Sequence, residues 1–113
     1  MSKDTLQSIE ESIRAGKALV DMNTALERLQ SNRDFRKVIL EGYFQAEAVR
    51  LVHLKADPAF QTTERQAQIV GQIDAIGGLH SYFTTVKALA SIAAKEVAEN
   101  EATREELLAE EVQ

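Results

Sequence analysis

The chain has 113 residues, of which 44% are hydrophobic and 5% aromatic, and it contains one Pro, five Gly and no Cys or Trp. This length fits one domain with a modest aliphatic core, and it excludes a catalytic fold joined to a separate regulatory domain. One Pro and five Gly are too few for the many turns of an all-β fold. We therefore expect an all-α protein. The lack of Cys excludes disulfides, thiolate zinc sites and cysteine nucleophiles.

The formal net charge of −5 is unevenly distributed. Residues 96–113 hold seven Glu and one Arg, a balance of −6, so residues 1–95 carry +1. A near-neutral body lacks the basic face that neutralises phosphates, and we therefore expect no nucleic-acid partner. We predict one helical domain over 1–98 and an acidic tail over 99–113, which is either a frayed end or a docking segment for a basic partner.

The first residues lead directly into an amphipathic pattern without an apolar signal core. No window of the sequence approaches 18 uninterrupted apolar residues. We therefore expect neither secretion nor a membrane partner.

The first predicted helix covers about residues 5–30. Its apolar residues recur three and four apart in two frames, with a slip around Gly16: Leu6, Ile9 and Ile13, then Leu19, Met22, Leu26 and Leu29. We predict one helix that bends at the slip. The alternative is a short arm before a second helix that is capped near Asn23 or Thr24. Ser31 and Asn32 predict a turn, and one of them caps the next helix.

The second predicted helix, over about 33–55, is the most apolar one. At 100° per residue, one arc of it faces a core: Phe35, Val38, Ile39, Gly42, Ala46, Val49 and His53. A second apolar stripe lies on the charged side and consists of Leu40, Phe44 and Leu51. Two apolar faces need two partners, so the second stripe packs either against another subunit or inside the monomer.

The third predicted helix covers about 64–98. Asp57-Pro58 ends the helix before it, since Pro disfavours helical backbone at the residue that precedes it. Phe60 is expected to tuck back from the connector, and Thr63 with Gln66 has the spacing of a capping box. Gly77-Gly78 inside the helix indicates either a close helix crossing or a break.

Apolar residues of the third helix also form a narrow seam for another helix. The seam consists of Ile69, Ile76, Leu79, Phe83, Val86, Ala90, Ala93 and Val97. Combined with the second stripe, it predicts the interface residues Leu40, Phe44, Leu51, Ile76, Leu79, Phe83 and Val86.

We predict no catalytic, cofactor-binding or metal-binding residues. His53 and His80 are the two imidazoles, and neither has the spacing of an HExxH or Glu-x-x-His motif, so both are expected to be structural or surface residues. The basic cluster Arg33, Arg36 and Lys37 is either a solvated helix start or a contact for an acidic partner or nucleic acid. No nucleophile motif or glycine-rich phosphate loop is present, and we therefore expect no enzyme.

Residues 38–58, VILEGYFQAEAVRLVHLKADP, resemble a type of small helical protein encoded in tailed-bacteriophage genomes, and the resemblance continues through QIDAIGGLHSYF at 72–83. It implies a virion component or assembly factor without catalytic residues. The resemblance also implies a protein made in a bacterial host cytoplasm and located there or in the virion.

We therefore expect an oligomeric helical hairpin or bundle of three main helices, with a non-catalytic structural or assembly role. The chain would pack against copies of itself or a larger virion protein. The alternative is a phage-encoded inhibitor or anti-defence protein that binds a host protein. A nucleic-acid-binding regulator that uses the turn at 33–37 fits the near-neutral body least.

Overall fold

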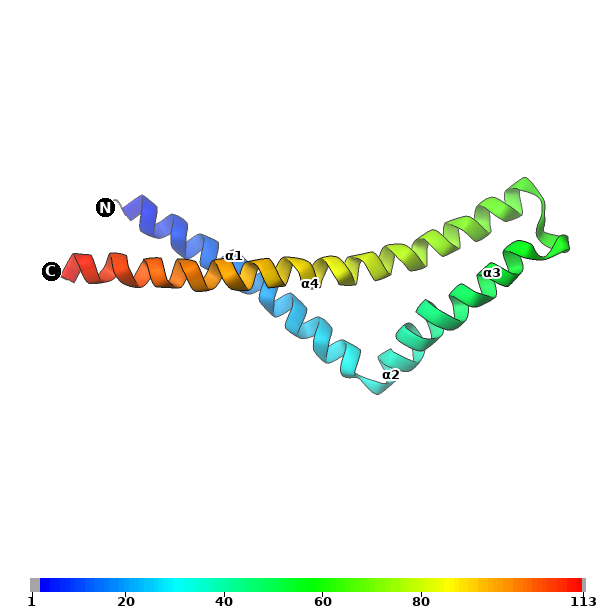
Figure 1. Ribbon diagram of the computed structural model, residues 1–113, viewed down its shortest axis with the longest axis horizontal. Helices are drawn as coiled ribbons and strands as arrows, with labels where there is room; N and C mark the ends of the chain where they lie inside the picture. The colour runs from blue at the N-terminus through cyan, green and yellow to red at the C-terminus, as the bar shows by residue number, and fades with distance from the viewer. Residues whose placement is uncertain (1–2, 113) are drawn as a thin grey trace. The chain divides into compact units, whose positions relative to one another are not determined.

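The computed structural model describes residues 3–112, and this range is helical except at the short connections and contains no strand (Figure 1). The predicted all-α class is therefore confirmed. The elements in chain order are α1 (Lys3–Ser31), α2 (Arg33–Phe35), the π-helix η1 (Arg36–Glu47), α3 (Ala48–Ala56), the 3₁₀-helix η2 (Pro58–Phe60) and α4 (Thr63–Val112). Within the described range, no helix is long and apolar enough to cross a membrane.

The first predicted helix is confirmed as one element, α1, but the frame slip at Gly16 is wrong. The covered positions of α1 keep alternating steps of three and four through Gly16: Leu6, Ile9, Ile13, Gly16, Val20 and Asn23. Leu26 and Gln30 continue the covered side after a second step of three. Gly16 is buried and occupies a position in this seam. Of the predicted shifted frame, Leu26 is buried, whereas Leu19, Met22 and Leu29 are exposed.

The second predicted helix is a continuous run of α2, η1 and α3. The predicted core arc is confirmed in part, since Phe35, Ile39 and Gly42 are half-buried, and it is wrong for its other four residues. Val38 and Val49, which were placed on that arc, are 63% and 56% exposed, and His53 is also exposed. The reason is the π-helical hydrogen bonding of residues 36–47, from each N–H to the carbonyl five residues earlier. An arc drawn at 100° per residue therefore drifts off the covered side, which at 43–48 consists of Tyr43, Phe44, Glu47 and Ala48.

The turns between the helices are closed by short polar side chains. Of the two predicted caps, Ser31 and Asn32, the structure shows Asn32. Its Oδ1 accepts a hydrogen bond of 2.9 Å from the Phe35 N–H at the start of α2. Asp57 is extended and ends α3 before Pro58, as predicted, and its Oδ1 accepts from the Ala59 N–H at 2.9 Å. The predicted capping box at Thr63 is wrong, since Thr62 Oγ1 is the group that accepts from the Arg65 N–H at 3.3 Å.

α4 continues to Val112, so the predicted end of this helix near residue 98 is wrong. Helix Thr63–Val112 also runs unbroken through Gly77 and Gly78. A Cβ added at either glycine meets nothing within 4 Å, which rules out the predicted close crossing at this pair. The seam predicted for the helix is confirmed, since Ile69, Ile76, Val86, Ala90 and Ala93 are buried and Leu79, Phe83 and Val97 are half-buried.

The chain divides into two units, and both α1 and α4 contribute to each. Unit 1 consists of residues 1–25 and 85–113, and unit 2 of residues 26–84. In unit 1, α1 and α4 run in opposite directions and bring the N- and C-terminal ends to the same side (Figure 1). The core of unit 2 is formed by Leu51, Ile69 and Ile76, against which Tyr43, Phe44, Ala48, Leu54, Phe60 and Ile73 pack. Phe60 therefore tucks back onto the core, as predicted.

Candidate functional site

The interface residues predicted in unit 2 are covered by the chain itself. Leu51 is 1% exposed and lies in the core with Ile76. The Phe44 ring meets two side chains of α4 edge-on, with centroid distances of 5.5 Å to His80 and 5.7 Å to Phe83. For Phe44 and Leu51, the structure thus shows burial inside the monomer, the second of the two alternatives. Leu40, Leu79 and Phe83 are half-buried as well.

Unit 1 is held together by a tight approach of α1 to α4 at Gly16. A Cβ added at Gly16 would lie 2.5 Å from Val97 Cγ2, 3.6 Å from the Ala93 carbonyl oxygen and 3.9 Å from Ala93 Cβ. The buried neighbours along this contact are Ile13, Val86, Ala90 and Ala93. The predicted interface residue Val86 is therefore also buried by the chain itself. The close crossing that the sequence placed at Gly77-Gly78 lies at Gly16 instead.

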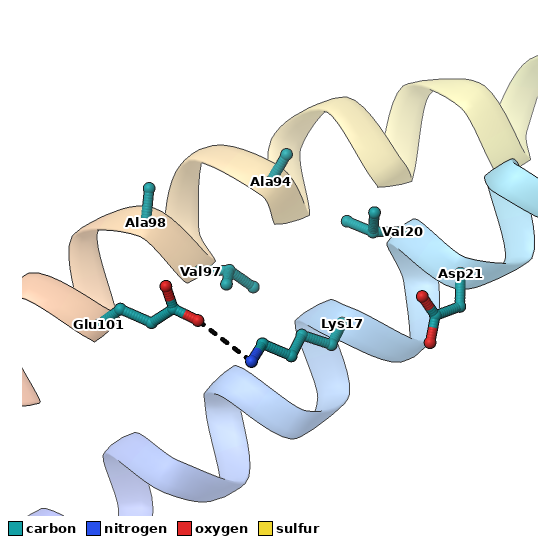
Figure 2. A pocket seen from close by; sticks show the side chains of 7 residues that line it. All are labelled: Lys17, Val20, Asp21, Ala94, Val97, Ala98 and Glu101. Atoms are coloured by element: carbon teal, nitrogen blue, oxygen red, sulfur yellow. Dashed lines mark ion pairs between the residues drawn. The ribbon is translucent and has the colours of Figure 1, made fainter.

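An ion pair marks one side of the helix pair in unit 1. Lys17 Nζ lies 3.2 Å from Glu101 Oε1, and Figure 2 shows the Lys17 side chain reaching from α1 toward α4. Lys17 directly follows the seam residue Gly16, and Glu101 directly follows Asn100, a half-buried residue that continues the seam of α4 beyond Val97. Residues at such positions flank the seam on one side in both antiparallel helices.

A shallow hollow of about 480 Å³ opens beside this ion pair (Figure 2). It is lined by Lys17, Val20, Asp21, Ala94, Val97, Ala98 and Glu101. Four of the seven lining residues are aliphatic (Val20, Ala94, Val97 and Ala98), so much of the hollow is a packing surface between the two helices.

The opposite side of the helix pair is apolar and exposed. Leu19 and Leu89 directly precede the seam residues Val20 and Ala90, a position that flanks the seam on the side away from Lys17. With their neighbours three and four residues away, they form a surface that we call the Leu19 face: Ala15, Leu19 and Met22 of α1 with Thr85, Leu89 and Ile92 of α4. All six residues are exposed.

Sequence reasoning missed this face. Leu19 and Met22 were assigned to the packing seam of α1, and Leu89 and Ile92 to no surface at all. The signal in the sequence is the repeat of apolar residues four and three apart that runs beside each seam. It identifies a face only when the true seam is known, and that depends on recognising Gly16 as a seam residue.

The predicted basic cluster lies in unit 2 around a second hollow, of about 460 Å³. Arg33, Arg36 and Lys37 line it with Ser31 and Glu41, and all five are exposed. A carboxylate at Glu41 among three cations leaves a mixed-charge surface rather than a focused basic site.

Among the described residues, no group of three or more His, Asp or Glu side chains could hold a metal ion. His80 is exposed and packs against Phe44, which agrees with the structural or surface role expected for it. His53, expected on a core arc, lies at the surface.

Comparison of the chain with protein-family models, with curated proteins and with solved structures gives no significant match. Functional inference therefore rests on the residues and on the geometry.

Proposed function

We propose that the chain is a non-catalytic structural or assembly protein that works through helix-to-helix association with copies of itself. Residues 38–58 and 72–83 resemble small helical phage proteins, and on this basis we propose that the chain is a small virion or head-assembly component of a tailed bacteriophage. In this proposal the helical units combine into an oligomeric bundle, in the host cytoplasm or in the virion.

The observation that carries the proposal is the Leu19 face. Single exposed apolar residues are ordinary on a protein surface. Here, however, four large side chains lie on the same side of one helix pair, with exposed fractions of 39% for Leu19, 52% for Met22, 44% for Leu89 and 57% for Ile92. Exposed apolar patches of this kind mark surfaces that bind another protein.

The proposal is tested by co-expressing a tagged and an untagged copy in bacteria and purifying the tagged one. We expect the untagged copy to be recovered with the tagged one when purification is carried out at high protein concentration, because each copy offers the same surface. Recovery of a single bacterial protein without the untagged copy would contradict self-association and favour the inhibitor alternative. The virion setting predicts that the chain is found in purified particles of the phage that encodes it, and its absence from them contradicts that setting.

A further inference from the structure

The two halves of the Leu19 face are built alike. On α1, Ala15, Leu19 and Met22 are spaced four and three apart, and on α4, Thr85, Leu89 and Ile92 have the same spacing. Each half thus presents one small residue followed by two large ones. Because the two helices run in opposite directions, a half-turn rotation about an axis perpendicular to the face approximately exchanges its two halves.

The large residues of the two halves also lie at matching heights. Gly16 packs between Ala93 and Val97, so position 16 lies opposite position 95. Equal numbers of residues along two antiparallel helices cover equal distances, since each rises about 1.5 Å per residue. Leu19 is therefore about level with Ile92, and Met22 about level with Leu89.

The charges of the same turns lie outside the face, either on the hollow side or, as Lys95 and Glu96 do, at its border on α4. Lys17 and Asp21 line the hollow on the opposite side of the helix pair. Lys87 directly follows the seam residue Val86, as Lys17 follows Gly16, and therefore belongs to the hollow side too. The face itself contains no charged residue and ends on α4 at the exposed Glu96. It therefore offers neither a charge that would select a foreign partner nor one that would repel a second copy.

We propose that the Leu19 face binds the Leu19 face of a second copy, so that two helix pairs form an antiparallel four-helix bundle about a two-fold axis parallel to the helices. This inference rests on the proposed self-association and assigns its surface. In this arrangement, α1 of one copy lies over α4 of the other, and every neighbouring pair of helices is antiparallel, as in common four-helix bundles. Leu19 then meets Ile92 of the second copy, and Met22 meets Leu89 of the second copy.

The area of the face agrees with a dimer of limited strength. From their exposed fractions, its six residues offer on the order of 500 Å² on each copy. A face-to-face dimer would bury on the order of 1,000 Å² in total, which is at the lower limit of specific interfaces. We therefore expect a dimer that dissociates on dilution.

The assignment is tested with Leu19→Glu/Ile92→Glu, which places like charges at the centre of the face. Glu is a good helix former and both positions are exposed, so helicity measured by circular dichroism should be unchanged. The matched control is Val49→Glu/Val52→Glu, which introduces the same charges at exposed apolar positions of unit 2, 56% and 61% exposed against 39% for Leu19 and 57% for Ile92. We expect the first variant to shift dimer dissociation to at least tenfold higher concentration and the control to dissociate like the wild type.

The pairing of the helices is tested with single cysteines, because the chain has none of its own. Leu19→Cys and Ile92→Cys are mixed and oxidised. The bundle predicts disulfide-linked heterodimers of the two variants in large excess over either homodimer. Homodimers of Leu19→Cys in excess would overturn the pairing of α1 with α4.

The two proposals fail in different ways. A wild-type chain that is monomeric at high concentration would contradict both self-association and the assigned surface. Dimer dissociation of Leu19→Glu/Ile92→Glu at the same concentration as the wild type would overturn the assigned surface alone.

Discussion

Gly16 of α1 faces Val97 of α4 so closely that a Cβ at position 16 would lie 2.5 Å from Val97 Cγ2. No real Cβ sits so close to another carbon, so the spacing of the two helices in unit 1 depends on the missing side chain. The contact also fixes which residues of α1 and α4 lie level with one another. The position of the Leu19 face follows from it.

Gly16→Ala is therefore expected to destabilise unit 1. Alanine gains about 1 kcal/mol in helix propensity over glycine, but overpacking a tight contact costs about 1–3 kcal/mol. The branched Val97 side chain has few rotamers with which to give way. We expect a net loss of about 1 kcal/mol in the free energy of unfolding, measured by urea denaturation.

The second arm of this test is Gly16→Ala in a Val97→Ala background. Removal of the Val97 methyl groups leaves room for the new Cβ, so the same substitution should become neutral or stabilising there. An equal effect of Gly16→Ala in both backgrounds would show that the two residues are not coupled.

Gly77→Ala and Gly78→Ala should have the opposite effect. Both glycines are exposed in the interior of α4, and an added Cβ meets nothing within 4 Å at either site. Each substitution should stabilise the chain by about 0.5–1 kcal/mol, because alanine loses less backbone entropy than glycine in a helix. A loss of stability in thermal unfolding would mean that a close contact exists at this pair after all.

Leu51→Ala should be among the most damaging single changes in unit 2. Leu51 is almost fully buried against Ile69 and Ile76, and truncation of a buried leucine typically costs about 2–5 kcal/mol. The adjacent Val52 is 61% exposed, so Val52→Ala should change the free energy of unfolding by no more than about 0.5 kcal/mol. Similar losses from both variants would contradict the observed orientation of α3.

Gln66→Leu should loosen the connection between α3 and α4. The Gln66 side-chain amide donates to the Lys55 carbonyl at 2.9 Å and to the Phe60 carbonyl at 2.8 Å. Gln61 Nε2 also donates to the Lys55 carbonyl, at 3.0 Å, so that oxygen keeps a partner in the variant. We expect a loss of about 1–2 kcal/mol, mainly from the Phe60 carbonyl. Gln68→Leu, at an exposed position of α4, is the control and should leave stability almost unchanged.

The sequence was most informative where a helix keeps its ordinary period. The seam begins at Ile69, follows alternating steps of three and four from Ile76 to Val97, and is covered at each of these positions. The helix end at Asp57-Pro58 could be predicted because proline disfavours helical backbone at the residue before it. The cap at Asn32 could be predicted because a short polar side chain can accept a hydrogen bond from the first turn of the helix. These features depend on local rules that a single helix obeys by itself.

The errors arose where a local rule was not enough. The π-helix at 36–47 changes the number of residues per turn, so Val38 and Val49 left the core that a period of 3.6 assigned to them. Gly16 appeared as a slip in an apolar pattern because a seam position occupied by glycine carries no hydrophobic signal. Phe44 and Leu51 appeared unpartnered because the sequence does not show which α4 residues cover them.

The most direct test of self-association is the mass of the wild-type chain in solution, measured by light scattering behind a sizing column from micromolar to millimolar concentration. The proposed dimer predicts a mass that rises with concentration from the chain's 12.5 kDa toward twice that value. A mass that stays at 12.5 kDa over the whole range would contradict it.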